Sequence, residues 1–214
     1  MAADLRLITE IRGTRGSAKR TIYLDGEPWR PTHRHAISEL GLTRGASVEP
    51  DAIEEQLAAI EPRLARERAY RLLGFRDRTA SEIARRLSQD GFPDSLIDAL
   101  VQDLIAAGLI DDRRLASALA PSLLTNRGYG RARALRELVH RGVPKDLAQA
   151  ALDAASSPAE ESARAAALAI RLCRPGDTPE RLAARLVRRG FATSTAFRAA
   201  RDALHDEHTD YPDT

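Results

Sequence analysis

Arginines are the side chains of this sequence whose type and spacing best suggest a chemical role. Residues 127–145 hold six cations against Glu137 alone, and residues 181–201 hold six arginines and no acid. A guanidinium binds phosphate through paired hydrogen bonds, and a row of cations gains affinity for a polyanion because each neutralised phosphate releases condensed counterions. The pattern therefore indicates contact with a phosphate backbone. The candidate DNA- and partner-binding residues are Arg127, Tyr129, Arg131, Arg133, Arg136, Arg141, Lys145, Arg181, Arg185, Arg188 and Arg189.

Tyr129 belongs to this set through the segment Gly128-Tyr129-Gly130, which has two interpretations. In the first, one glycine ends a helix, the other frees the entry to the next helix, and the tyrosine covers the corner between them. In the second, the tyrosine touches a partner directly. The sequence favours the first and leaves the second open.

Residues for catalysis are not evident in the sequence. Cys173 is the only cysteine, so neither an internal disulfide nor a zinc cage of thiolates can form within the chain. No Gly-rich phosphate loop appears, and no nucleophile can be paired with a base. We predict a protein that is not an enzyme and that has no cofactor and no metal site.

The overall composition is that of a globular protein, with 43% hydrophobic residues in 214. No run approaches the roughly 18 apolar residues of a membrane span, and the first residues, MAADLRLITEIR, lack the order of a signal peptide. We expect a cytoplasmic protein without membrane contact. The net charge is only +2, so the distribution of charge is more informative than its sum.

From residue 51 onward, the sequence contains a pattern of residues that occurs three times. Three helical segments align on Leu87, Leu138 and Leu186, and each has a glycine four residues later followed by an apolar residue. Each aligned segment follows another predicted helix, over about 51–75, 111–127 and 159–173. The pattern predicts three copies of a three-helix unit, which pack mainly against their neighbours along the chain.

The first residues differ from the repeats. The segments LRLITEIR and RTIYLD are typical of strands, and Asp25-Gly26 suits the two-residue turn of a hairpin. A short helix ending at Gly41 and a linker, LTRGASVEP, follow. The predicted fold is mainly α, with tandem three-helix repeats in an elongated, crescent-like body and a small N-terminal β-hairpin element. The predicted domains are 1–50 for that element, 51–108, 109–156 and 157–206 for the repeats, and 207–214 for a flexible tail.

The helical period assigns faces to the middle helix of each repeat. At 100° per residue, Leu135, Leu138 and Val139 share the predicted buried side of the second repeat. The opposite arc is predicted to hold Arg133, Arg136, Glu137, His140 and Arg141. The third repeat has Arg181, Arg185, Arg188 and Arg189 at four of these outer positions, whereas the first has Glu82, Arg86, Gln89 and Asp90. One surface is therefore expected to become basic toward the C-terminus.

Several blocks in order resemble the RecX regulatory family. The segments AYRLLGFRDRTASEIARRLSQDGF, GLIDDRRLASALA and RGYGRARALRELVHRGV resemble its helical blocks, and TIYLDGEPW resembles the hairpin of some longer members. The resemblance covers about residues 5–204. Two departures concern packing, since Leu115 replaces a usual aromatic and the third repeat lacks the proline that follows Phe92 and Val143.

The resemblance implies a bacterial modulator, usually an inhibitor, of the RecA recombinase. Such a protein binds the recombinase filament on DNA and suppresses ATP hydrolysis, strand exchange and coprotease activity in DNA repair and the SOS response. The expected partners are this filament and single- and double-stranded DNA without strong sequence preference, and we expect a monomer. The acidic stretch 90–112, with six aspartates and no cation, is expected to face protein.

Two alternatives to this function stay open. A free-standing helix-turn-helix transcription factor is the first, although the second helix of the first repeat, which would enter the major groove, is acidic. A scaffold with acidic and basic faces for another protein is the second.

Overall fold

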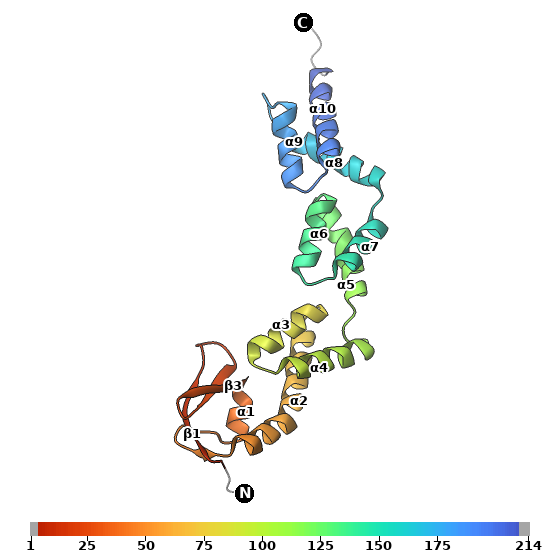
Figure 1. Cartoon of the computed structure of the whole chain (residues 1–214). Helices are drawn as coiled ribbons and strands as arrows, with labels where there is room; N and C mark the ends of the chain where they lie inside the picture. Colours follow the sequence, from red (N-terminus) through yellow and green to blue (C-terminus); the bar gives the residue numbers. More distant parts are fainter. Residues whose placement is uncertain (1–3, 210–214) are drawn as a thin grey trace. The chain divides into compact units, whose positions relative to one another are not determined.

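The computed structural model describes residues 4–209, with side chains for residues 4–205. It divides the chain into two compact units, which we call unit 1 (up to Asp111) and unit 2 (from Asp112). Figure 1 shows that strands occur near the N-terminus of unit 1 and that the remaining elements are helices, as the sequence predicts. None of the described helices combines the length and the hydropathy of a membrane-spanning segment.

A small antiparallel sheet begins unit 1. Its strands are β1 (Arg6–Arg12), β2 (Lys19–Leu24), β3 (Glu27–His33) and β4 (Ser47–Val48), in the order β3-β2-β1-β4. Asp25 and Gly26 connect β2 to β3 with φ angles of 50° and 91°, so the predicted hairpin turn is confirmed. The segment predicted as a linker contains β4, which the sequence missed because two residues are too few to show an alternating pattern.

The core of this N-terminal element lies between the sheet and α1 (Arg34–Glu39). Ile8, Ile22 and Leu24 of the sheet are fully buried, and Ile37 of α1 packs against them. The other sheet face carries polar and charged side chains, including Lys19. Arg12 belongs to this face as well, because a register shift between Ile8 and Glu10 changes the alternation along β1.

The first repeat consists of α2 (Pro50–Phe75), α3 (Ala80–Asp90) and α4 (Asp94–Ala106). At the start of α3, Thr79 and Glu82 form a capping box, with each side chain accepting a backbone N–H. At its end, Gly91 has a φ of 96°. Leu87 of α3 and Leu100 and Leu104 of α4 then pack on Leu64 and Leu72 of α2.

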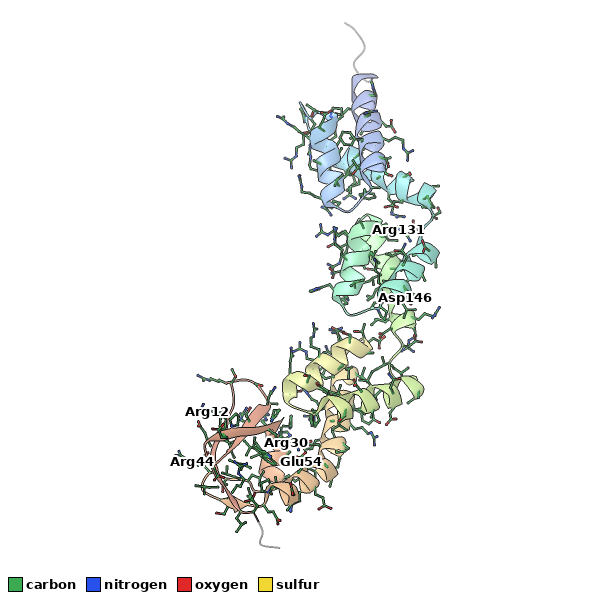
Figure 2. All side chains as sticks on the ribbon, in the orientation of Figure 1. Arg12, Arg30, Arg44, Glu54, Arg131 and Asp146 are labelled. Atoms are coloured by element: carbon green, nitrogen blue, oxygen red, sulfur yellow. The ribbon has the colours of Figure 1, made fainter. Side chains whose placement is uncertain are left out.

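The N-terminal element packs on the first repeat through β3. His33 stacks on Phe92 with ring centroids 5.1 Å apart, and Thr32 donates a hydrogen bond to the buried Glu61 over 2.6 Å. Arg30 forms ion pairs with Glu61 and Glu54, the second of which is labelled in Figure 2. Burial raises the pKa of Glu61, while Thr32 and Arg30 oppose that rise. The N-terminal element and the first repeat therefore share one compact unit.

His33 is expected to make unit 1 sensitive to mild acid. Burial, with a smaller effect of His35, lowers the pKa of His33 from 6.5 to about 4. The folded state therefore protonates His33 less readily than the unfolded state does. The stability that depends on neutral His33 is fully present above pH 6.5 and is lost as the pH falls toward 4. We expect a loss of about 2 kcal/mol between pH 6.5 and 4.5. Urea denaturation at a series of pH values, followed by the fluorescence of Trp29, the only tryptophan, measures this change in the free energy of unfolding.

The matched variant is His33→Asn, which keeps an acceptor for the N–H of His35 but does not titrate. It should lack this pH dependence, whereas His140→Asn, at an exposed position, should retain it. Equal pH dependence in the wild-type protein and His33→Asn would contradict the assignment.

Unit 2 contains the second and third repeats. The second consists of α5 (Asp112–Pro121), continued by the π-helical turn η1 (Ser122–Asn126), then α6 (Arg131–His140) and α7 (Lys145–Ala155). The third consists of α8 (Pro158–Leu172), α9 (Pro179–Arg188) and α10 (Thr193–Thr209). Of the predicted tail, residues 207–209 belong to α10, and the rest lies outside the described residues.

Equivalent positions of the three repeats have equivalent environments. Leu87, Leu138 and Leu186 are all fully buried. The glycines that follow them have φ angles of 96°, 89° and 94°, which a side chain would strain. The predicted three-helix repeat is confirmed at these positions, whereas the division of unit 2 into two domains stays a prediction.

The predicted buried face of α6 is partly wrong. Val139 is 42% exposed, while Ala134 is fully buried. At 100° per residue, Ala134 lies about 40° from Leu138 around the helix and Val139 about 100° away. The apolar size of valine suggested burial, but the angular position decides it.

Candidate nucleic-acid interface

The second and third repeats meet end to end within unit 2. The N–H groups of Gly130 and Ala132, at the start of α6, donate to the carbonyls of Arg189 and Gly190, at the end of α9, over 2.9 and 3.1 Å. These are donors and acceptors that a helix end leaves unpaired, so each helix satisfies the other. We call this contact the repeat junction.

Glycines allow this close approach. A Cβ on Gly130 would lie 2.2 Å from the backbone N of Phe191, and a Cβ on Gly190 would lie 2.4 Å from the Cβ of Arg133. Gly130 has an ordinary φ of −71°, so its requirement for glycine arises from the neighbouring repeat alone. Gly128 has a φ of 60° after η1, in agreement with the predicted helix end.

Arginines from both repeats surround the junction. The guanidinium of Arg133 lies 4.3 Å from the centre of the Tyr129 ring, and its Nη1 lies 3.5 Å from the carbonyl oxygen of Arg188. Arg189 reaches back to the carbonyl of Arg127 over 3.4 Å. We call these arginines, with Arg181, the junction surface: Arg127, Arg133, Arg181, Arg188 and Arg189.

Two neighbouring hollows lie on this surface. One of about 360 Å³ is lined by Arg133, Leu172, Arg185, Arg188 and Arg189. The other, of about 340 Å³, is lined by Arg174, Asp177, Arg181, Ala184, Arg185 and Arg188. Arg185 and Arg188 line both, and among the residues that the structure describes Asp177 is the only acid that lines either hollow.

The junction surface is electrostatically uncompensated. Among the described residues, no carboxylate forms an ion pair with any of its five arginines. The pKa of the Tyr129 hydroxyl is lowered, mainly by a hydrogen bond from Arg127 and also by the positive charge of Arg133. A concentration of unpaired cations creates a positive potential that attracts polyanions.

Tyr129 covers the corner, as its first interpretation predicts. Its ring packs against the core of the second repeat while Arg133 lies over the ring. A direct contact between Tyr129 and a partner stays a prediction.

The sequence predicts that Arg185 faces outward to contact phosphate, but in the structure its guanidinium binds groups of the protein itself. It pairs with Asp177, and its Nη1 donates to the carbonyl of Leu172 over 2.7 Å. Its side chain is only 19% exposed. Arg185 therefore braces the loop between α8 and α9, because that loop supplies a carboxylate and a carbonyl within its reach.

The side chains of the remaining predicted residues do not belong to the junction surface. Arg131, labelled in Figure 2, pairs with Asp153 of α7, and its backbone N–H donates to Glu161 of α8. Arg141 is 3.5 Å from Glu137, and Lys145 begins α7. Arg141 and Lys145 follow the C-terminus of α6, whereas the junction is at its N-terminus, and the helix is about 15 Å long. Arg136 is exposed on the same helix between the two ends.

Sequence reasoning missed Arg174 and Asp177. The Asp177 carboxylate accepts the backbone N–H of Arg174 over 2.9 Å, which closes the loop before α9. An aspartate directly before Thr178-Pro179 is a turn signal that could have placed it there. Within residues 4–205, no three His, Cys, Asp or Glu side chains gather in a way that could hold a metal ion.

Asp177 is expected to oppose DNA binding while it stabilises the third repeat. Asp177→Asn removes the negative charge of the second hollow and releases the guanidinium of Arg185, so we expect DNA affinity to rise about threefold. The same change should lower the free energy of unfolding, since the ionic hydrogen bond to Arg185 is lost. Fluorescence anisotropy and urea denaturation measure the two effects. Asp202→Asn, an equal charge change at an exposed site of α10, should produce neither.

Comparisons with known proteins identify relatives of this sequence. Residues 65–104 match the family model described as RecX, first three-helix domain, and residues 111–152 match RecX, second three-helix domain. The regulatory protein RecX of Thermobifida fusca is 33% identical over 164 residues, which cover 72% of this chain and 89% of that protein. The regulatory protein RecX of Mycolicibacterium smegmatis is 34% identical over 163 residues, covering 70% and 86%.

Solved structures share the fold. A crystal structure of regulatory protein RecX matches with a TM-score of 0.61 and 22% identity, over 92% of this chain and all of that chain. RecX from Lactobacillus salivarius matches with a TM-score of 0.60 and 18% identity, over 69% of this chain and 99% of that chain. At these identities the likeness establishes the fold alone.

Proposed function

The chain belongs to the RecX family of regulatory proteins, and from this membership we propose that it inhibits the RecA recombinase by binding the recombinase filament on DNA. In this proposal it suppresses ATP hydrolysis, strand exchange and coprotease activity during DNA repair and the SOS response. It acts in the cytoplasm as a monomer and catalyses no reaction. Its effect comes from binding energy, which favours filament states that cannot complete the nucleotide cycle.

The observation that carries this proposal is the junction surface. Arg127 and Arg133 of the second repeat lie beside Arg188 and Arg189 of the third, without carboxylate partners among the described residues. Phosphates of a DNA strand would supply the missing negative charge. Each such contact releases counterions, so binding should weaken steeply with salt.

Recognition of DNA by this surface should depend little on sequence. Guanidinium contacts to phosphate position a protein on DNA but carry no base information. The aromatic ring at the junction, Tyr129, is covered by Arg133 and packs on the core, which leaves it poorly suited to stack on bases. Both single- and double-stranded DNA are therefore proposed ligands.

An acidic surface on unit 1 supports a separate contact with protein. Asp94 and Asp98 are exposed on α4, and Asp103 is only weakly paired, 3.5 Å from Arg66. Asp90 does not belong to this surface, since it is buried and pairs with Arg68 over 2.7 Å. We assign the exposed aspartates to a basic surface of the recombinase, because phosphate would repel them.

A helix-turn-helix transcription factor is the alternative function. It would place the last helix of a repeat in the major groove, where the exposed aspartates of α4 would face phosphates. A repressor protects one DNA sequence in a footprinting experiment, whereas a filament regulator shows little base preference. A scaffold protein would bind no DNA even at low salt.

Titration of the chain into a recombinase ATPase assay on single-stranded DNA tests the proposal. The rate of ATP hydrolysis should fall as the chain is added, and a reaction without DNA provides the background. Order-of-addition experiments separate effects on filament assembly from effects on a formed filament. An unchanged rate at saturating chain would overturn the proposed function.

A further inference from the structure

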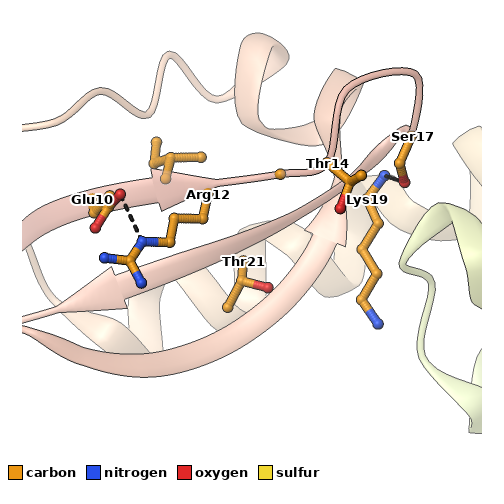
Figure 3. Close-up of a pocket in the computed structure, with 8 residues that line it drawn as sticks. Glu10, Arg12, Thr14, Ser17, Lys19 and Thr21 are labelled. Atoms are coloured by element: carbon orange, nitrogen blue, oxygen red, sulfur yellow. Dashed lines mark hydrogen bonds and ion pairs between the residues drawn. The ribbon is translucent and has the colours of Figure 1, made fainter.

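The loop between β1 and β2 forms a second basic surface, on unit 1. Residues 12–20 hold Arg12, Arg15, Lys19 and Arg20 and no acid. Arg12 and Lys19 line a hollow of about 640 Å³ on the hairpin, shown in Figure 3. The residues that line it are Glu10, Ile11, Arg12, Gly13, Thr14, Ser17, Lys19 and Thr21.

Two of these cations are held by the hairpin itself. Nη1 of Arg20 donates to the carbonyls of Ser17 and Lys19 over 2.8 and 2.9 Å, and a Cβ on Gly13 would lie 2.4 Å from that nitrogen. Arg12 pairs with Glu10 over 2.7 Å, and its guanidinium lies 4.8 Å from the centre of the Tyr23 ring. Arg20 therefore braces the loop, while Arg12 neutralises the one acid of the hollow.

Arg15 and Lys19 have no comparable partner among the described residues. Arg15 and Lys19 are exposed, and neither forms an ion pair within the part of the chain that the structure describes. They stand within a few residues of Arg12 and Arg20 in the same loop. Such a group of like charges repels itself, and an anionic ligand would relieve the repulsion.

The hollow also supplies neutral donors for phosphate oxygens. Hydroxyl groups of Thr14, Ser17 and Thr21 line it beside Lys19. Ser17 accepts the backbone N–H of Lys19 over 3.1 Å, which leaves its own hydroxyl hydrogen to donate. Lys, Arg, Ser and Thr side chains are the usual partners of the nucleic-acid backbone.

We propose that the β1–β2 loop binds the phosphodiester backbone of DNA, as a second contact besides the junction surface. The inference deepens the proposed function and rests on it for the choice of DNA as the polyanion. A protein partner is less suitable, because none of the exposed large apolar residues of the described chain lies between residues 12 and 21 to anchor it. Two DNA contacts on one chain would raise its affinity through the tether that joins them.

The test is DNA binding by the whole 214-residue chain without recombinase. The double variant Arg15→Glu, Lys19→Glu should bind a labelled single-stranded oligonucleotide about tenfold more weakly at low salt, with a salt slope lower by about 1.5, because two phosphate contacts are lost. The same oligonucleotide as a duplex shows whether the loop prefers either form. The matched control is Arg71→Glu, Arg85→Glu, which makes the same charge change at exposed sites of unit 1.

Comparison with a junction variant, Arg181→Glu, Arg188→Glu, separates this inference from the proposed function. Weaker binding by the loop variant, with the control near the wild-type affinity, supports the loop contact whether or not the junction variant is affected. A loop variant that binds like the control, beside a weakened junction variant, overturns the loop contact and leaves the proposed function intact. Wild-type affinity and salt slope in all the variants overturn both DNA contacts.

Discussion

Reversing the charges of Arg127, Arg181 and Arg188 together is expected to weaken DNA binding about 100-fold at low salt. These arginines belong to the junction surface and have no carboxylate partners among the described residues, so their replacement breaks no ion pair inside unit 2. Each lost phosphate contact also removes the release of its counterions. The slope of log affinity against log salt should therefore fall by about 2 to 3.

Fluorescence anisotropy with labelled single- and double-stranded DNA over a salt series provides the measurement. The control is Arg113→Glu, Arg171→Glu, Arg201→Glu, which changes three exposed arginines of unit 2 that line neither hollow. Circular dichroism verifies that both triple variants are folded. If the control variant loses as much DNA affinity as the junction variant, DNA binding depends on the net charge of the chain and the junction surface is not a specific DNA-binding site.

The largest expected effect on stability comes from Gly130→Ala. The new methyl group would meet the backbone of Gly190 and Phe191 at 2.2 to 2.4 Å, and neither backbone segment can rotate away as a side chain could. Either α6 or the end of α9 must shift, which breaks the hydrogen bonds between the two helices. We expect unit 2 to lose about 3 kcal/mol of stability, the upper range for overpacked sites.

Gly176→Ala is the matched control for this variant. Gly176 has a φ of 77°, but an added Cβ would meet nothing within 4 Å. The substitution should therefore lower the free energy of unfolding only by the strain of alanine in a left-handed conformation, about 1 kcal/mol. Urea denaturation followed by circular dichroism compares the two. Hydrogen exchange at the amide of Ala132 should accelerate in Gly130→Ala alone, because its acceptor is Gly190. Equal destabilisation by the two variants would contradict the close contact between the repeats.

The repeats were predictable because their signals are local. The helical period and the capping residues act within one or two turns, and Gly91, Gly142 and Gly190 recur at the same offset from a buried leucine. Exceptions have local causes as well. The strand β4 is too short to have a period, and Ala134 is too small to stand out as a core residue beside Val139.

The candidate site was only partly predictable. Arg185 and Arg188 are both arginines on α9, and nothing in their own sequence positions distinguishes a guanidinium that pairs with Asp177 from one that stays unpaired. Likewise, Arg131 and Arg133 are separated by one residue, yet the first pairs with Asp153 and the second lies over Tyr129.

By itself, the sequence determined that the chain is built of three helical repeats behind a small β-element, and that its cations concentrate in the second and third repeats. Spacing along one chain suffices for this, since helices and charge runs depend on neighbouring residues. Only the tertiary structure decided which arginines are available to a phosphate. An ion pair depends on where a distant carboxylate lies in space, and that position is set by the packing of helices and loops rather than by the local pattern.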